Sequence, residues 1–243
     1  MKKLYVVICV SALVLLSGCA EILNQLAQSA AKGERGLSTE EVVRGLKEAL
    51  VVGAANSTSL TSKEDGFFKN PLIVIPFPPE AIKVKKTVED MGLKNIVKDF
   101  ERSLNRAAEK ASQKALPILK NAVMNMTFSD AMGILRGADN AATEYLRRTT
   151  SDALRAEFTP VVKSAVEAVE VTKYWNPIVS AYNKTTWLTG EKAVNPDLDK
   201  YITQKALDGM FVLIAKEELK IRRDPVARVT DILKKVFGSV QIK

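Results

Sequence analysis

The side chains that most often carry out chemistry in proteins are scarce in this sequence. It contains no histidine, and its two cysteines, Cys9 and Cys19, both precede Ala20. A Ser-His-Asp triad, a Cys-His dyad and a His-ligated zinc or haem site therefore cannot be assembled from this chain alone. The sequence predicts no metal site, no cofactor and no catalytic residue. Any catalysis would depend on Asp, Glu, Lys, Tyr, Ser or Thr.

The adjacent acids Glu217 and Glu218 are the first candidates for acid–base chemistry. Two carboxylates can hydrolyse a glycosidic bond when they are held at the right separation and one has a raised pKa. Neighbouring side chains on a helix point about 100° apart, so these two acids would not face each other. Arg222 follows Glu218 at the spacing of a helix salt bridge. We therefore favour a structural role for Glu218 over a hydrolytic one.

Other site motifs are weak or missing. Asp197 and Asp199 have the spacing of calcium-loop ligands, but the glycine and the closing Glu of an EF-hand are absent. Acids in the first turn of a helix are explained by the helix dipole. No GxxxxGK or GxGxxG segment is present, which argues against nucleotide binding. The excess of 36 Lys and Arg over 28 Asp and Glu suits acidic lipids or wall polymers, and no nucleic-acid motif accompanies it.

Aromatic residues gather in one segment, which is the candidate ligand or partner surface. It contains both tryptophans and two of the five tyrosines: Tyr174, Trp175, Tyr182 and Trp187. Polar residues interleave with these rings, so the rings could stack on sugars such as those of peptidoglycan. The alternative is the edge of the core, where Trp and Tyr place their polar tips in water. We favour core packing.

Cys19 has a different chemistry, that of lipid attachment. Lys2 and Lys3 precede an apolar run from Leu4 to Leu16, which is typical of a secretory signal and shorter than the ~20 residues that span a bilayer. The segment Leu16-Ser17-Gly18-Cys19 resembles the bacterial lipobox, in which the signal is cut before a cysteine whose sulfur carries a diacylglyceryl group. The alternative is an ordinary signal peptide with an incidental cysteine.

The lipobox resemblance implies a permanent membrane anchor. Acyl chains such as palmitate would be attached to the sulfur and to the new amino terminus of Cys19, and two or more chains hold a protein on a membrane. In the enterobacterial sorting rule, an Asp after the cysteine retains the protein in the inner membrane, and here Ala20 follows instead. We expect the periplasmic face of the outer membrane rather than the inner membrane.

The elements that position these residues read mostly as helices. Residues 1–18 are the predicted signal peptide, residues 19–37 a tether, and residues 38–243 a single domain. Ser38 and Glu41 form a predicted capping box that opens a helix to about Ala54, and a polar loop is expected over 56–70. Further helices are predicted from Glu80 to about Met91, ending at Gly92, and over residues 97–126. Pro117 should kink or split the second of these near Lys114.

The second half of the chain predicts helices that follow one another closely. Two should open at Ser129 and Asp139, and a capping residue before proline marks three further starts at Thr159, Asn176 and Asp224. A helix from about Leu198 to Arg223 follows a capping segment at 195–197, and its apolar middle, 210–215, predicts a buried central helix.

Residues 71–79 are the segment that does not suit a helix. Its β-branched residues lie between prolines, which favours a short edge strand near residues 72–75, with residues 239–243 as a conceivable partner. The predicted fold class is therefore all-α: a single-domain multi-helix bundle of about eight helices with at most a minor short β pairing.

Several short segments between Leu37 and Gly238 together form the pattern of a known family. They are Gly66–Phe68, Asn105–Glu109, Ala115–Ile118, Asp130–Leu135, Ala141–Tyr145, Leu198–Gly209, Glu217–Glu218 and Lys234–Gly238. Together they resemble a group of bacterial lipoproteins classified only as domain of unknown function 4197. The resemblance implies a fold and an envelope location, and it transfers no activity, ligand or catalytic residue.

The functional expectation is a lipid-anchored periplasmic domain that acts by binding or scaffolding. Its partners would be the membrane, through lipid on Cys19, and envelope proteins or peptidoglycan, with no nucleic acid. One alternative is a carrier of a lipid or another apolar ligand, because Ala-rich helices could surround a cavity. The least favoured alternative is a hydrolase built on carboxylates. The oligomeric state is left open.

Overall fold

The computed structural model describes residues 38–90, 92–168, 175, 179–180, 182–184, 186–187, 190, 192–194, 197–224 and 234. The predicted signal peptide and tether, residues 1–37, lie outside these ranges. Within them seven α-helices and one 3-10 helix have described bounds, and the described residues between 175 and 187 and residue 234 are also helical. No residue of these ranges is in a strand, which confirms the all-α bundle. Helices from Glu41 onward belong to one compact unit, Glu41–Lys243.

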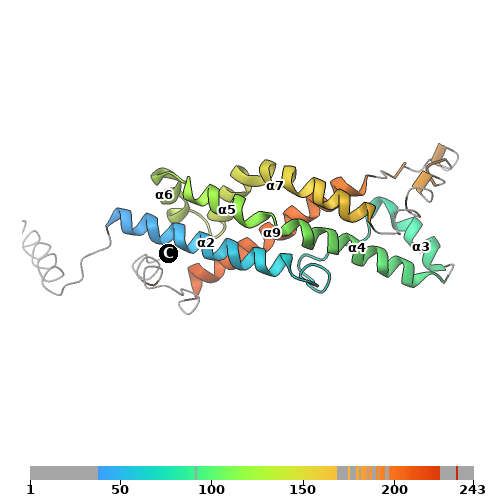
Figure 1. Cartoon of the computed structure of the whole chain (residues 1–243), viewed down its shortest axis with the longest axis horizontal. Coiled ribbons are helices and arrows are strands. Elements are labelled where there is room, and N and C mark those ends of the chain that lie inside the picture. Colours follow the sequence, from blue (N-terminus) through green and yellow to red (C-terminus); the bar gives the residue numbers. More distant parts are fainter. Residues whose placement is uncertain are drawn as a thin grey trace, which may run out of the picture. The chain divides into compact units, whose positions relative to one another are not determined.

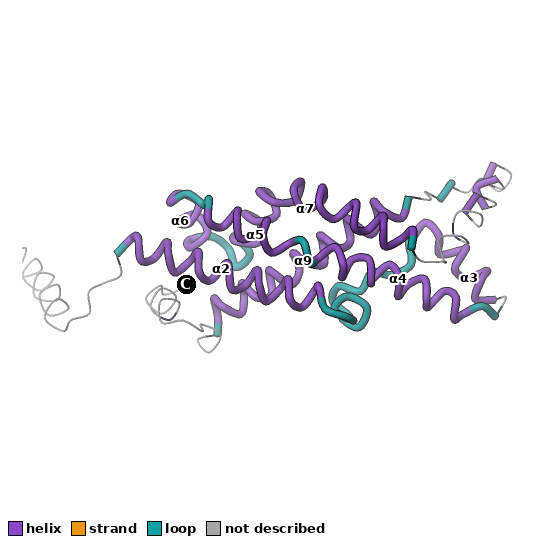
Figure 2. Tube along the Cα trace, viewed as in Figure 1, coloured by secondary structure: helices purple, strands orange, loops and turns teal. Residues whose placement is uncertain are grey.

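The elements between residues 79 and 167 follow one another through short loops, whereas residues 63–78 form a longer connection, as Figure 2 shows. They are α2 (Thr39–Ser62), η1 (Pro79–Ala81), α3 (Ile82–Asp90), α4 (Lys94–Ser112), α5 (Ala115–Met124), α6 (Phe128–Arg136), α7 (Ala141–Glu167) and α9 (Leu198–Arg223) (Figure 1). No helix in the described part of the chain is long and apolar enough to cross a membrane.

The core forms where α4, α7 and α9 pack on one another. On α4 the buried stripe is rich in alanine, and Ala108 and Ala111 are completely buried. Small side chains let neighbouring backbones approach closely, as the Ala-rich pattern predicts. Residues 210–214 of α9 are buried as expected except at Val212, which is 43% exposed, and Ala215 is half-buried. The central position of α9 is thereby confirmed.

Several predicted helix boundaries are confirmed. Helix α3 is followed by Gly92, whose φ of 82° is the left-handed conformation of a C′ glycine. The long predicted helix is split before Pro117, because α4 ends at Ser112 and α5 begins at Ala115. Asp197 caps α9 by accepting a hydrogen bond from the backbone N–H of Lys200 at 3.2 Å.

Helices α6 and α7 begin close to their predicted starts but use other caps. Thr127, two residues before Ser129, caps α6 in a capping box with Asp130. Asn140, one residue after Asp139, takes the N-cap position of α7 without a side-chain cap bond.

The predicted loop over 56–70 begins too early, because α2 continues to Ser62. Ser57, Thr58 and Thr61 lie on the buried face of this last part of α2. The Thr61 hydroxyl donates to the carbonyls of Ser57 at 3.0 Å and Thr58 at 3.1 Å. Burial against the core therefore outweighs the preference of these polar residues for turns.

The predicted edge strand near 72–75 is not found; the described residues of this segment are turn and irregular backbone. Alternate residues Ile73, Ile75 and Phe77 are buried, which is the side-chain pattern of a strand. The backbone of Ile75 pairs with the side chain of Asn105 instead, at 2.8 Å to its N–H and 2.9 Å to its carbonyl. A helix side chain thus takes the place of a partner strand. The suggested partner, residues 239–243, lies outside the described residues.

The predicted helix start at Thr159 is wrong, because Pro160 lies inside α7. Phe158 and Val162 are completely buried on one face of α7, on either side of the proline. Their packing outweighs the ~3 kcal/mol that an interior proline costs a helix. The predicted starts after Asn176 and Asp224 fall on residues that are not described.

Candidate functional site

The aromatic segment singled out from the sequence is divided between interior and surface. Trp175 is 4% exposed and stacks on Phe100 of α4 with ring centroids 5.0 Å apart. Phe77 completes the cluster, at 5.6 Å from the Trp175 ring and 4.9 Å from the Phe100 ring. Trp175 therefore belongs to the core between α4 and the segment before α3.

Trp187 is the part of this set that meets solvent. Its side chain is 78% exposed, whereas Tyr182 is half-buried. Asn183, beside Tyr182, receives the Val194 N–H at 2.7 Å and donates to the Val194 carbonyl at 2.8 Å. Trp175 and Trp187 thus do not share one exposed surface, and Tyr174 lies outside the described residues.

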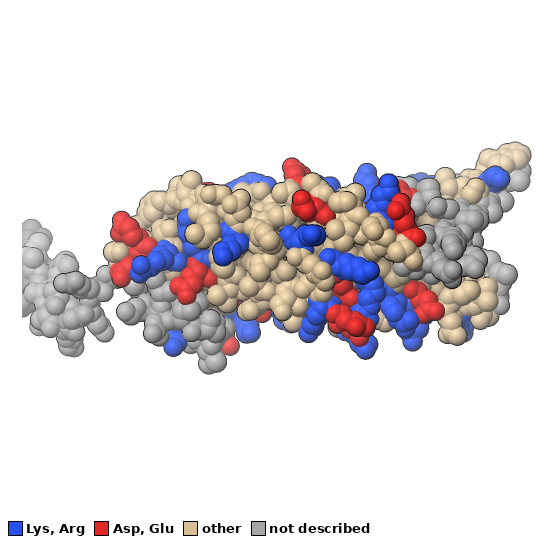
Figure 3. Space-filling view, in the orientation of Figure 1, with Lys and Arg blue, Asp and Glu red and all other residues tan. Residues whose placement is uncertain are grey.

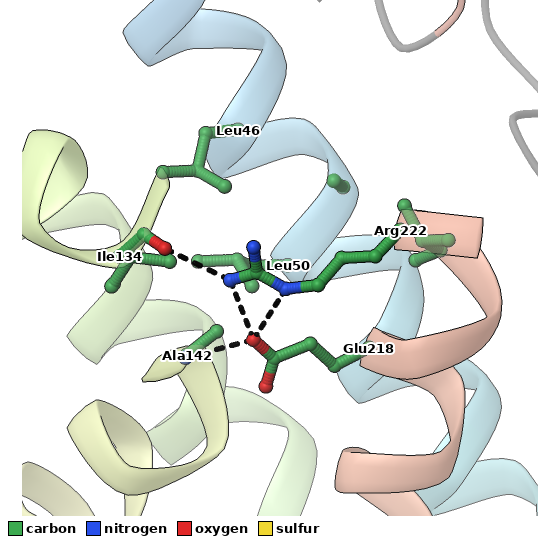
Figure 4. Close-up of a pocket in the computed structure, with 8 residues that line it drawn as sticks. Leu46, Leu50, Ile134, Ala142, Glu218 and Arg222 are labelled. Atoms are coloured by element: carbon green, nitrogen blue, oxygen red, sulfur yellow. Dashed lines mark hydrogen bonds and ion pairs between the residues drawn. The ribbon is translucent and has the colours of Figure 1, made fainter. Parts of the chain in front are cut away.

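Glu218 and Arg222 form a buried ion pair on α9, with side chains 5% and 4% exposed (Figure 4). The Glu218 carboxylate receives the Arg222 guanidinium at 2.8 and 3.0 Å. It also accepts the backbone N–H groups of Ala142 at 3.0 Å and Thr143 at 2.9 Å, and the Thr143 hydroxyl at 2.8 Å. The predicted i,i+4 salt bridge is confirmed, and it is buried.

This ion pair completes the ends of two other helices. Asn140 provides no side-chain cap for α7, so Glu218 satisfies the first N–H groups of that helix and places a negative charge at its positive end. Arg222 donates to the carbonyl of Ile134 near the end of α6 at 2.9 Å. One residue earlier, Glu217 points elsewhere and accepts from Asn56 of α2 at 3.0 Å. The two glutamates therefore do not form an acid pair.

A second buried carboxylate accepts backbone N–H groups of the loop after α2. Glu109 is 3% exposed and accepts the N–H groups of Phe67 at 3.0 Å and Phe68 at 3.3 Å. Arg106 joins Glu109, at 2.5 Å, to Asp65 at the start of this loop, at 2.6 Å. Hydrogen bonds from Lys69 and from Arg106 lower the pKa of Asp65.

The turn at this loop needs a glycine. A Cβ atom on Gly66 would lie 2.2 Å from the carbonyl oxygen of Leu60, so no larger residue fits. Asp65, just before it, has a positive φ of 62°. The carboxylate of Glu109 therefore receives N–H groups from a tightly constrained turn.

A pocket beside Glu218 and Arg222 is lined mainly by apolar side chains of α2 and α9 (Figure 4). Its lining residues are Leu46, Ala49, Leu50, Ile134, Ala142, Glu218, Ile221 and Arg222. Its volume is about 20 Å³, enough for one water molecule, whereas ligand pockets measure ~300–1,000 Å³. Among the described residues, no three His, Cys, Asp or Glu side chains gather as metal ligands would.

One protein family matches most of the chain. A family model described as a protein of unknown function, DUF4197, matches residues 36–238. The chain belongs to this family. No curated protein and no solved structure shows a significant match to it.

The buried hydrogen bonds connect segments on which the DUF4197 resemblance rests. Glu109 in Asn105–Glu109 binds the backbone of Gly66–Phe68, and Glu218 binds the backbone of Ala141–Tyr145. Each contact joins residues far apart in the sequence, so helical periodicity does not reveal it. The only sequence signal was a charged or amide side chain on an otherwise apolar helix face. These parts of the DUF4197 domain hold its helices and loops in place.

Proposed function

We propose that this DUF4197 protein is a lipid-anchored protein of the bacterial cell envelope whose helical domain acts by binding. The segment Leu16-Ser17-Gly18-Cys19 supports the anchor, because an apolar run, small residues and a cysteine follow one another as in a lipobox. Helix α2 begins at Thr39, so residues 20–37 would separate the lipid from the domain. Ala20 after the cysteine favours the periplasmic face of the outer membrane.

The binding role is supported by the contacts of the buried charged side chains, which are made with the backbone. The carboxylates of Glu109 and Glu218 accept backbone N–H groups, and the guanidinium of Arg222 donates to a backbone carbonyl. A carboxylate held by several donors is a support for the fold rather than a free acid or base. The buried charges thus define a rigid scaffold, and its surface is where contacts with other molecules would form.

The partner we propose is an envelope protein or peptidoglycan, contacted through the surface around Trp187. An exposed tryptophan is a typical anchor of an interface, because its large ring buries area at low entropic cost. Lys184, also exposed, lies three residues before Trp187. The lipid carrier draws no support from the small pocket described above, and the hydrolase draws none from Glu217 and Glu218.

Replacement of each cysteine separately tests the anchor. Cells that produce Cys19→Ala should incorporate no labelled palmitate into the protein and should release it from the membrane fraction. Cys9→Ala is the matched control, since it also removes a thiol from the amino-terminal segment but leaves the lipobox intact. Equal palmitate labelling of the two variants would refute the anchor.

A photo-crosslinking amino acid at position 187 in intact cells tests the binding surface. We expect a discrete crosslinked product with an envelope protein or with peptidoglycan fragments. The same probe at Ser59, an exposed residue of α2, should not give this product. Identical products at both positions, or none at position 187, would refute the Trp187 surface.

A further inference from the structure

Helix α5 and the start of α6 expose large apolar side chains. Met124 is 58% exposed and Phe128 is 54% exposed, and Pro117 is also exposed on α5. Pro117 and Met124 are seven residues apart, two turns of the helix, and so lie on the same face. Leu119 and Val123 of α5 are buried, whereas no described part of the chain covers this face.

The same face carries positive charge. Lys114 and Lys120 are exposed, and neither forms an ion pair with an acid in the described part of the chain. The sequence has no Asp or Glu between Glu109, which is buried, and Asp130, which is held in the α6 capping box. Figure 3 shows uncharged atoms and Lys and Arg side chains predominating over α5 and the adjoining part of α2.

Neighbouring helices add to this positive character. Lys47 of α2 donates to the carbonyl of Met124 at 2.9 Å, at the negative end of α5. Arg148 of α7 lies 5.8 Å from the ring of Tyr145, whose hydroxyl donates to the carbonyl of Ala122 on α5. Lys47 thus adds a cation at the Met124 end of this face, and Arg148 lies beside a tyrosine that contacts α5.

We propose that this surface, defined as Lys114, Pro117, Lys120, Met124 and Phe128, docks on an anionic lipid bilayer. Apolar side chains that enter the interface, flanked by lysines that reach the headgroups, are the chemistry of an interfacial helix. The inference deepens the proposed function, because it gives the anchored domain a second contact with its membrane.

A bilayer fits this surface better than a second copy of the chain. Two copies that met through it would bring Lys114 and Lys120 against the same residues, and like charges at an interface cost binding energy. A lipid anchor makes the second membrane contact intramolecular, so weak binding is sufficient. Residues 20–37 extend at most ~60 Å, more than the ~36 Å length of α2, so the anchor would not prevent α5 from reaching the bilayer.

A fluorescent probe at position 124 tests the proposal. The acylated protein with Met124→Cys is labelled with an environment-sensitive dye and placed in vesicles of phosphatidylcholine, with or without phosphatidylglycerol. Beyond Cys19 the natural chain has no other thiol. We expect blue-shifted emission only in vesicles with phosphatidylglycerol. Ser59→Cys, an exposed control on α2, should keep the emission of a dye in water.

Charge removal gives the second measurement. Lys114→Gln with Lys120→Gln should lower the ratio of inserted to water-exposed dye roughly 30-fold, since each lysine near an anionic surface contributes to binding. Both side chains are exposed, so circular dichroism should show an unchanged fold. A water-like emission from position 124 on anionic vesicles would overturn docking. So would an equal response in phosphatidylcholine alone, or one that depends on protein concentration without vesicles.

The same preparations separate this inference from the anchor. Palmitate labelling reports acylation of Cys19, and the dye reports docking of α5. An acylated protein with a water-exposed dye would contradict only the docking. If Cys19 is not acylated, the anchor fails, and co-sedimentation of the unmodified chain with anionic vesicles still measures docking. Absence of co-sedimentation would then overturn docking as well.

Discussion

Neutralising Glu218 gives the sharpest test of how the helices are held together. Glu218→Gln preserves the shape of the side chain but removes the charge that faces Arg222, whose side chain is 4% exposed. It also replaces one of the oxygens that accept the Ala142 and Thr143 N–H groups, at 3.0 and 2.9 Å, with an amide nitrogen. The result is a buried cation without its counterion and a helix start with an unsatisfied donor.

The expected loss is a large fraction of the stability of the domain. Removal of one partner from a buried ion pair costs ~3–5 kcal/mol, and an unsatisfied buried donor costs ~1–3 kcal/mol. Because the remaining oxygen of Gln still accepts some of these hydrogen bonds, we expect Glu218→Gln to lower the free energy of unfolding by ~3 kcal/mol. The free energy of unfolding of a typical domain is ~5–15 kcal/mol, so a urea titration followed by circular dichroism should detect this loss clearly.

Glu217→Gln is the matched control, the same change one position earlier. Glu217 contacts Lys220 at 3.9 Å, with the lysine side chain 54% exposed, and a glutamine can still accept from Asn56. We expect a loss below ~1 kcal/mol. Adding Arg222→Met to Glu218→Gln removes the unpaired cation and should restore ~1–2 kcal/mol. Equal losses for Glu217→Gln and Glu218→Gln, or no recovery in the double variant, would refute the reasoning.

Three further predictions concern packing, polar satisfaction and pH. Gly209→Ala should lower the free energy of unfolding by ~1–3 kcal/mol, because its Cβ would lie 2.7 Å from an aromatic ring of the loop after α2. Gly133→Ala is the control: its Cβ would meet no atom within 4 Å, so it should stabilise α6 by ~0.5–1 kcal/mol in the same urea titration. Asn105→Asp should lower the free energy of unfolding by ~2–4 kcal/mol, since a carboxylate cannot donate to the carbonyls that this side chain binds at 2.7 and 2.9 Å. Asn121→Asp, the same change on the exposed face of α5, should lower it by less than ~0.5 kcal/mol. Burial raises the pKa of Tyr201 from 10.0 to about 12, so the stability that comes from its neutral phenol is complete below pH 10 and is lost as the pH rises towards 12. Unfolding curves of Tyr201→Phe should therefore decline less steeply over this range than those of the unaltered protein, and an identical decline would contradict the burial of this phenol.

Local rules predicted much of the helical framework from the sequence. Pro117 splits the long helix, Gly92 ends α3, and Asp197 begins α9, because each position is governed by covalent geometry or by a nearby hydrogen bond. The apolar middle of α9 identified the central helix, because a helix that is apolar on all sides has to be buried.

Tertiary contacts explain where these local rules failed. Pro160 looked like a helix start, but burial of Phe158 and Val162 carries α7 through it. Residues 72–75 looked like a strand, but Asn105, some thirty residues later, takes the backbone hydrogen bonds of Ile75. Propensity describes the preference of an isolated segment, and here packing outweighs it.

The candidate site was predicted only in part, for the same reason. The spacing of Glu218 and Arg222 predicted their salt bridge, but not its burial or its contacts with α6 and α7. Trp175 and Trp187 lie twelve positions apart, and nothing in that spacing says that one enters the core while the other faces solvent. The exposed face of α5 became visible only when the buried residues of the helix were known.

Mass spectrometry of the amino-terminal peptide of the mature protein tests the central claim, that this domain works while anchored to a membrane. The protein is purified from membranes of its native cell type or of a bacterial host with lipoprotein processing. The account predicts a chain that begins at Cys19, with a diacylglyceryl group on its sulfur and a further acyl chain on its amine. A chain that retains residues 1–18, or one in which Cys19 has a free thiol, would contradict it.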